Sequence, residues 1–304
     1  MGDSGGLASR VMPSRSLAAL IAALSLLALP AAAQAAKAKP QYYVSLGDSY
    51  AAGYQRFSAT DAKTTRDGFA YQLVNKARKR GYKLKLVNFG CGGETSVSIL
   101  KRKTKCLGLG PGGVDYAGQT QAAAAAEFLR KHKGQVKLIT VSIGGNDVTA
   151  CAREADPVAC VGPAMETVKA NGKLLLERLR KAAGKKTRIV GITYPDVILG
   201  SWVGENPNQD LAKLSVVAFQ SLLNPALKEM YSSVGGKFVD VTKATGAYTP
   251  LEQTTTLEPY GVIPEAVAEV CKITAYCAYR DIHPNAKGYG VIADLIAKTL
   301  PHKH

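Results

Sequence analysis

The sequence lacks several features that would place it in other functional classes. No Cys-x-x-Cys pair is present, and histidine is scarce, so a zinc site of the usual spacing is not predicted. The four histidines are His132, His283, His302 and His304. No Gly/Ser-rich or Pro-rich linker and no internal repeat divides the chain. These absences favour a single globular domain that needs neither a metal nor an organic cofactor.

Only one long apolar run is present, and it lies at the amino terminus. Two arginines precede an apolar stretch at 17–29, and the small-x-small sequence Ala33-Gln34-Ala35 follows it. This order is typical of a secretory signal peptide. An uncleaved membrane anchor is the alternative, but the stretch is shorter than the ~17 residues that a membrane-spanning helix needs. We therefore predict a signal peptide at 1–35, cleavage near Ala35, and a secreted single domain at 36–304.

All six cysteines lie in the predicted mature chain. An even number of cysteines in an exported protein indicates disulfides. Pairs that are close in the sequence cost the least chain entropy to close. The pairs expected on this basis are Cys91–Cys106, Cys151–Cys160 and Cys271–Cys277.

Acidic residues are few compared with basic ones. The whole chain has a formal charge of +16, and residues 36–304 hold 37 basic and 22 acidic residues, a charge of +15. Such a surface favours association with anionic surfaces or polymers. The densest basic runs, 76–85 and 101–105, are explained more simply as solvated helix or loop faces. No nucleic-acid-binding motif accompanies them, so no specific nucleic-acid partner is predicted. The protein is expected to be a monomer.

Apolar runs of strand length alternate with segments of helical spacing. The predicted strands are 42–46, 84–89, 136–143, 187–193 and 237–241. The predicted helices are 67–80, 117–131, 163–183, 208–233 and a last helix from about Asn285, with Tyr289, Ile292, Ala293 and Ile296 facing inward. This alternation predicts a three-layer α/β/α fold around a central, mostly parallel five-stranded sheet. In such sheets, ligands bind beyond the carboxyl ends of the strands.

Polar motifs stand where predicted strands end. Gly47-Asp48-Ser49-Tyr50 follows the first strand, and Gly144-Gly145-Asn146-Asp147 follows the third. Near the end of the chain lies Asp281-Ile282-His283-Pro284. A serine, an asparagine and a histidine at one sheet edge are the parts of a nucleophilic hydrolase site.

Gly-Asp-Ser alone is a weak signal, because Gly2-Asp3-Ser4 repeats it within the predicted signal peptide. Only Ser49 follows a strand pattern. Taken alone, Ser49 suits a helix N-cap, and His283 suits a structural position before a proline. The other three histidines lie at a predicted helix end or in the terminal tail and are expected to be solvated.

Four motif blocks, in order, resemble the SGNH (GDSL) hydrolases. The blocks are Gly47–Tyr50, Asn88–Thr95, Gly144–Asp147 and Asp281–Asn285, and they span nearly all of the predicted mature chain. With the expected disulfides, the resemblance is to the secreted actinobacterial lipase/esterase type. It implies a flavodoxin-like SGNH hydrolase fold and hydrolysis of carboxylic esters through an acyl-enzyme intermediate.

The resemblance also implies roles for individual residues. Ser49 corresponds to the nucleophile and His283 to its base; a histidine suits this task because the ordinary imidazole pKa lies close to working pH. The oxyanion hole corresponds to the backbone N–H groups of Ser49 and Gly93 and the side-chain amide of Asn146. Gly93 is expected rather than Gly92, because it directly precedes Glu94-Thr95. Taken alone, the glycines and Asn146 suit turns or helix caps.

One position departs from the family pattern. The family places an aspartate three residues before the histidine, where this chain has Arg280, while Asp281 stands only two residues before. Because adjacent positions point differently, Asp281 is expected to face away from the imidazole. We therefore predict a Ser49–His283 dyad, oriented by a backbone carbonyl such as that of Arg280 in preference to Asp281.

Several alternatives stay open at this point. Tyr50, Tyr54, Trp202 and Tyr260 are expected near the active edge, where they either line an acyl site or pack internally. With no long lid in the sequence, we expect an open cleft that takes an acyl ester or lipid. Phospholipase A, thioesterase and polysaccharide acetyl esterase activities use the same machinery as a lipase or esterase. A basic, anion-binding envelope protein on an inactive hydrolase scaffold is the non-enzyme alternative, although the retention of all four site residues argues against it.

Overall fold

The computed structural model describes residues 39–303. The predicted signal peptide at 1–35 and His304 lie outside these residues. Within 39–303, no helix has both the length and the apolar character that crossing a membrane would require.

Five parallel strands form the central sheet, in the order β4-β1-β5-β6-β7. They are β1 (Gln41–Gly47), β4 (Leu84–Asn88), β5 (Val136–Ser142), β6 (Arg188–Ile192) and β7 (Lys237–Val239). Each strand coincides with one of the predicted apolar runs. Numbered among themselves, the strands follow the flavodoxin-like order 2-1-3-4-5. The predicted α/β fold is therefore confirmed, with a sheet that is entirely parallel.

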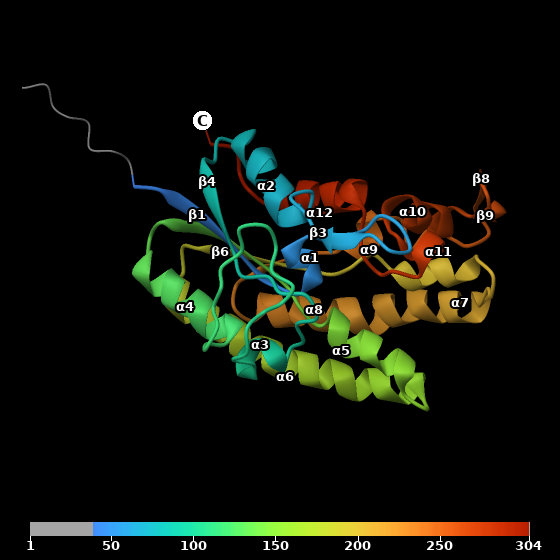
Figure 1. The fold of residues 1–304 in the computed structure, drawn as a ribbon, viewed down its shortest axis with the longest axis horizontal. Coiled ribbons are helices and arrows are strands. Elements are labelled where there is room, and N and C mark those ends of the chain that lie inside the picture. Colours follow the sequence, from blue (N-terminus) through green and yellow to red (C-terminus); the bar gives the residue numbers. More distant parts are fainter. Residues whose placement is uncertain (1–38, 304) are drawn as a thin grey trace, which may run out of the picture. The chain divides into compact units, whose positions relative to one another are not determined.

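Helices cover both faces of this sheet (Figure 1). On one face lie α2 (Phe69–Arg78) and α12 (Ala286–Lys298), and on the other lie α4 (Gln121–Lys131), α6 (Pro157–Ala183) and α8 (Asn224–Ser232). The main apolar core fills the space between these layers and the sheet. Asn285 caps α12, and the four side chains of α12 that were predicted to face inward are fully buried.

The predicted helix at 208–233 is divided into three segments. These are α7 (Gln209–Ala218), the π-helical segment η3 (Phe219–Leu223) and α8. Pro225 stands in the first turn of α8 and has no N–H to donate to the preceding turn. The wider π turn just before it accommodates that missing bond, which helical periodicity alone does not reveal.

Short elements occupy the connections that leave the carboxyl ends of the strands. They are α1 (Ser49–Ala52), β2 (Tyr54–Arg56), β3 (Ala62–Thr64), α3 (Ser98–Lys101), α5 (Gly145–Thr149), η1 (Ala150–Arg153), η2 (Val197–Trp202), α9 (Val241–Ala244), β8 (Thr254–Leu257), β9 (Gly261–Pro264), α10 (Glu265–Ile273) and α11 (Tyr276–Tyr279). A second, smaller apolar cluster is built from η2, α7, β9 and α10. Trp202 and Tyr260 pack against this cluster.

Three disulfides link neighbouring elements. They join Cys91 to Cys106, Cys151 to Cys160 and Cys271 to Cys277, which are the local pairs expected from the sequence. No free cysteine remains in the described part of the chain.

Candidate active site

Ser49 is the first residue of α1 and follows β1 through a tight turn. Gly47 has a φ of 129°, and a Cβ on it would lie 1.9 Å from the carbonyl oxygen of Ser142, so only glycine lets β1 end this close to β5. Asp48 caps α1 by accepting the backbone N–H of Tyr50 at 3.0 Å. Ser49 is consequently held at the carboxyl edge with 7% of its surface exposed.

The Asp48 carboxylate is buried and joins three strand ends. It accepts the hydroxyl of Tyr194, which follows β6, at 2.6 Å, and that of Ser142, the last residue of β5, at 3.1 Å. Burial raises the pKa of Asp48 to about 6, although these hydrogen bonds oppose the shift. The turn that carries Ser49 is thus tied to β5 and to the segment after β6.

Ser49, His283 and Asp281 lie in a line of short polar contacts. The imidazole Nε2 is 2.8 Å from Ser49 Oγ, and Nδ1 is 2.6 Å from Asp281 Oδ1. The same carboxylate oxygen accepts the backbone N–H of His283 at 3.0 Å. Because an ionised carboxylate can only accept, the proton of the neutral ring lies on Nδ1, and Nε2 is left to accept from the serine hydroxyl.

The prediction that a backbone carbonyl, such as that of Arg280, lies at Nδ1 in place of Asp281 is therefore wrong. Arg280 adopts a left-handed conformation with a φ of 53°, which redirects the chain after α11. Its guanidinium donates to the carbonyls of Gly200 at 3.0 Å and Val203 at 2.7 Å. With the chain turned in this way, an aspartate only two residues before the histidine reaches the imidazole.

Arg56 holds the other oxygen of the Asp281 carboxylate. Its Nε donates to Oδ2 at 2.7 Å, while its Nη1 donates to the carbonyl of Ala59 at 3.0 Å. Burial alone would raise the pKa of Asp281, but the hydrogen bonds from His283 and Arg56 outweigh it and hold that pKa well below its usual range. Asp281 is therefore ionised at neutral pH. Nothing in the sequence pattern marked Arg56 for this position.

The loop that carries His283 is fixed by contacts on both sides. The backbone N–H of Ala275 donates to the carbonyl of His283 at 3.0 Å, and the Tyr50 hydroxyl donates to that of Ile282 at 2.7 Å. The ring of Tyr54 lies 4.4 Å from the imidazole between centroids. Of the four aromatic residues singled out in the sequence, Tyr50 and Tyr54 therefore lie at His283, whereas Trp202 and Tyr260 pack in the smaller cluster.

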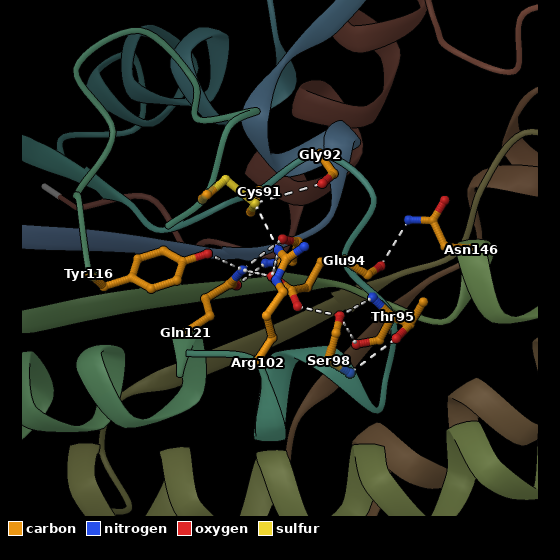
Figure 2. Close-up of polar contacts among 11 residues, drawn as sticks. Cys91, Gly92, Glu94, Thr95, Ser98, Arg102, Tyr116, Gln121 and Asn146 are labelled. Atoms are coloured by element: carbon orange, nitrogen blue, oxygen red, sulfur yellow. Dashed lines mark hydrogen bonds and ion pairs between the residues drawn. A yellow bond between two sulfur atoms is a disulfide. The ribbon is translucent and has the colours of Figure 1, made fainter. Parts of the chain in front are cut away.

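The three expected oxyanion donors come from the turns after β1, β4 and β5. Gly92 donates its N–H to the carbonyl of Gly108 at 3.0 Å, whereas Gly93 is exposed with a φ of 75°. Within residues 39–303, the backbone N–H groups of Ser49 and Gly93 have no acceptor. The Asn146 amide donates to the carbonyl of Glu94 at 2.8 Å (Figure 2). These contacts favour Gly93 over Gly92 as a donor to a bound oxygen.

A buried polar network around Glu94, which the sequence did not reveal, supports this region (Figure 2). The Glu94 side chain is 1% exposed; it accepts the Ser98 hydroxyl, Arg102 Nη2 at 2.8 Å and Gln121 Nε2 at 3.2 Å. Gln121 also accepts the N–H of Gly47 at 2.7 Å and donates to its carbonyl at 3.0 Å. The turn before Ser49 and the loop of Gly93 are thus connected through one buried carboxylate.

Arg102 belongs to the basic run at 101–105 that was interpreted as a solvated face. For Arg102 this interpretation is wrong, since its guanidinium reaches Glu94 and lies 3.0 Å from Cys91 Sγ. Among residues 39–303, no group of three or more His, Cys, Asp or Glu side chains is arranged to hold a metal ion.

A flavodoxin-like sheet that presents a Gly-Asp-Ser turn, an asparagine and a histidine at its carboxyl edge defines the class of SGNH hydrolases. The chain belongs to the GDSL-like lipase/acylhydrolase family, whose model matches residues 45–291. It is thereby a hydrolase of ester substrates, as the resemblance of its motifs predicted. No curated protein is similar enough to the chain to count as a match.

The similar solved structures are distant in sequence. A phospholipase A1 from Streptomyces albidoflavus is 16% identical, with 86% of this chain and 100% of that chain covered and a TM-score of 0.47. An extracellular lipase from Streptomyces rimosus is 16% identical, with coverages of 85% and 98% and a TM-score of 0.46. An aryl esterase from M. smegmatis is 12% identical, with coverages of 85% and 97% and a TM-score of 0.44. At these identities and scores, they carry no information about the ester that this chain cleaves.

Proposed function

We propose that the chain is a secreted carboxylic-ester hydrolase, a lipase or esterase, in which Ser49 is the nucleophile and His283 its base. The observation that carries this proposal is the pair of contacts that join Ser49 Oγ to Nε2 at 2.8 Å and Nδ1 to Asp281 Oδ1 at 2.6 Å. A serine hydroxyl is a weak nucleophile until an adjacent base takes its proton, and these contacts support His283 as that base.

In the first half of the reaction, Ser49 Oγ attacks the ester carbonyl carbon while His283 Nε2 accepts the hydroxyl proton. The carbonyl oxygen becomes an oxyanion, stabilised by the N–H groups of Ser49 and Gly93 and the amide of Asn146. When the tetrahedral intermediate collapses, the imidazolium gives its proton to the departing alcohol. The acyl group is then bonded to Ser49.

In the second half, His283 takes a proton from water as the water oxygen attacks the acyl carbon. The acid is released, and the proton returns to Ser49 Oγ. Asp281, ionised because of its lowered pKa, keeps the ring in the tautomer with Nδ1–H and stabilises the imidazolium.

Export of the protein is part of this proposal. Three disulfides close local loops, as is common in chains that leave the reducing cytosol. The pattern at 1–35 supplies a route, and 36–304 would be the single exported domain.

Ser49→Ala tests the mechanism. Hydrolysis of p-nitrophenyl esters should fall to near the rate in water, with the thermal midpoint kept, because only the attacking oxygen is lost. An organophosphonate should label the wild type at Ser49. Ser232→Ala, an exposed serine in the last turn of α8, is the matched control and should keep full activity. Turnover in Ser49→Ala well above the rate in water, with no phosphonate adduct on the wild type, would contradict the mechanism.

A graded set of p-nitrophenyl esters then separates the alternatives. Preference for short acyl chains indicates an esterase, and preference for long chains indicates a lipase. Phospholipid, acyl thioester and acetylated polysaccharide substrates extend the set to the three related activities.

A further inference from the structure

The lysines and arginines of this chain are unevenly placed along the alternating strands and helices. Five segments each begin at the end of a helix. Four of them lead into the next strand, and the last leads to the end of the chain; they are 78–86, 130–138, 180–189, 232–238 and 298–303. They hold 17 lysines and arginines and no aspartate or glutamate. A helix that follows one parallel strand and precedes the next runs antiparallel to both, so these segments belong to one end of the sheet.

Contacts between the segments confirm that they lie together. Strand starts are paired in register, with Gln41 opposite Leu84 and Tyr42 opposite Val136. The Arg80 guanidinium donates to the carbonyl of Leu300 at 2.7 Å, and the backbone N–H of Lys303 donates to the carbonyl of Arg80 at 3.0 Å. Figure 1 accordingly shows the end of the chain beside the start of β4. We call this surface the amino-terminal edge; Ser49 lies at the opposite, carboxyl edge.

The carboxyl edge has the opposite charge balance. Its connections, 48–68, 89–120, 143–156, 193–208 and 240–285, hold 16 acidic and 11 basic residues. The excess positive charge of the protein is therefore not spread evenly over its surface. It is concentrated at the edge that is remote from the candidate active site.

Structural roles explain only part of this concentration. Arg80, Arg180 and Arg188 donate to backbone carbonyls, and cations in the last turns of helices complement the helix dipole. Four exposed lysines, Lys83, Lys133, Lys185 and Lys186, lie beyond the helix ends. Their ammonium groups form none of the ion pairs found among the described residues.

We propose that the amino-terminal edge binds a linear, highly charged anionic polymer. Neighbouring strands lie about 4.8 Å apart, so the row of strand starts extends for roughly 20 Å, which suits an extended chain of regularly spaced anions. The large apolar side chains exposed in the described chain all lie outside the five segments, which disfavours insertion into a lipid bilayer. Binding at this edge leaves Ser49 accessible to substrate, and the inference does not depend on the proposed mechanism.

Heparin is the probe for the test. The edge variant carries Lys83→Gln, Lys133→Gln, Lys185→Gln and Lys186→Gln. The control variant loses the same charge at exposed lysines elsewhere, through Lys103→Gln, Lys105→Gln, Lys228→Gln and Lys243→Gln. The Kd for heparin should rise about tenfold or more in the edge variant and less than about twofold in the control. The slope of log Kd against log salt should fall by about 3 in the edge variant, because up to four counterion-releasing contacts are lost.

Long-chain polyphosphate should reproduce the heparin result, since the edge recognises charge density and not the sulfate group itself. Equal weakening in both variants would show that net charge alone acts and would overturn the proposal, as would no weakening in either. Tighter binding to phosphatidylglycerol vesicles than to heparin, lost in the same edge variant, would overturn it in favour of a membrane. Hydrolysis of p-nitrophenyl acetate should be unchanged in both variants. Polymer binding and ester hydrolysis are therefore measured separately, and a failure of the binding proposal is distinct from a failure of the proposed function.

Discussion

At the residue scale, Asp281 divides its two carboxylate oxygens between two partners. One oxygen faces His283 Nδ1, and the other accepts Arg56. Arg56 keeps the carboxylate ionised and in place. Its positive charge also makes the carboxylate less basic, so the carboxylate attracts the imidazole proton less strongly. The roles of these two residues can be separated by substitution.

Asp281→Asn should lower kcat/KM by about ten-thousandfold, because an amide that donates to Nδ1 favours the wrong tautomer. Thermal unfolding should show whether the fold is kept, and Asp61→Asn, at an exposed aspartate, should leave the rate unchanged. A loss under about tenfold would mean that another acceptor orients the ring and that the contact seen here is not needed.

Arg56→Gln should have a milder effect than Asp281→Asn. Removing the guanidinium raises the pKa of Asp281 from its lowered position but leaves an ionised carboxylate that still accepts from Nδ1 at neutral pH. The loss in kcat/KM at neutral pH should therefore be smaller than that of Asp281→Asn, and Arg56→Lys, which keeps the charge, should restore part of it. An unchanged kcat/KM in Arg56→Gln would assign Arg56 to structure alone.

Asp196, which follows β6, gives a prediction for stability. It is buried, its Oδ1 has no partner in the described structure, and its Oδ2 accepts the Ser215 hydroxyl at 2.9 Å. Burial raises its pKa to about 7, above the ordinary value near 4 in the unfolded chain. The stability that this carboxyl contributes is thus complete below about pH 4 and is lost as pH rises through about 7.

Asp196→Asn cannot ionise and should escape that loss. Wild type should lose on the order of 4 kcal/mol of unfolding free energy between pH 4 and pH 8 that Asp196→Asn does not lose. The difference in stability between the two should therefore shift by that amount in favour of the variant. Urea denaturation at several pH values measures this difference, with Asp210→Asn as the exposed control. Parallel pH dependences for Asp196→Asn and wild type would show that Asp196 does not titrate in this range.

At the element scale, the turn after β1 and the loop after β4 act as one unit. The side chain of Gln121, on α4, accepts the N–H of Gly47 and donates to its carbonyl. Glu94 in turn accepts from both Gln121 and Arg102. The Cys91–Cys106 disulfide closes the same loop close to Gly93. The spacing of the proposed oxyanion donors therefore depends on side chains that do not touch the substrate.

Glu94→Ala should destabilise the protein by about 1–3 kcal/mol, because it leaves the buried Gln121 amide and the Ser98 hydroxyl without their acceptor, while Arg102 is partly exposed and can be solvated. If Glu94 also positions Gly93, kcat should fall by about tenfold or more while KM changes little. Glu127→Ala, an exposed position on α4, is the matched control for both measurements. A stability loss with kcat unchanged would make Glu94 a structural residue only.

At the scale of the whole molecule, two apolar clusters of unequal size share one chain. Tyr248 packs against both, and α7 continues through η3 into α8, which covers the sheet. We predict that the proposed exported domain, 36–304, unfolds in a single transition. Calorimetry should give a van't Hoff enthalpy equal to the calorimetric one with the disulfides intact. Two resolved transitions would instead separate the α10 region as an independent unit.

Much of the fold was predictable because its signals are local. Buried parallel strands are continuous apolar runs, and the spacing of Tyr289, Ile292, Ala293 and Ile296 places them on one helix face whatever surrounds it. Cysteines that are close in the sequence meet without a long loop closure. That Ser49 and Asn146 lie at the same edge was predictable, because each lies shortly after a strand and a parallel sheet brings all its carboxyl ends to one edge.

The rest was decided by contacts between residues that are distant in sequence. Whether Asp281 faces His283 depends on the left-handed turn at Arg280 and on Arg56, more than 200 positions away. Glu94 lies in a motif block and Arg102 in a basic run, but nothing in the sequence connects them with Gln121. Gln121 reaches Gly47, and so joins it to Glu94, only when α4 packs beside β1. The concentration of charge at the amino-terminal edge has the same origin: the sequence by itself contains five separate basic segments, and only the parallel sheet, which brings every strand start to one side, makes them a single surface.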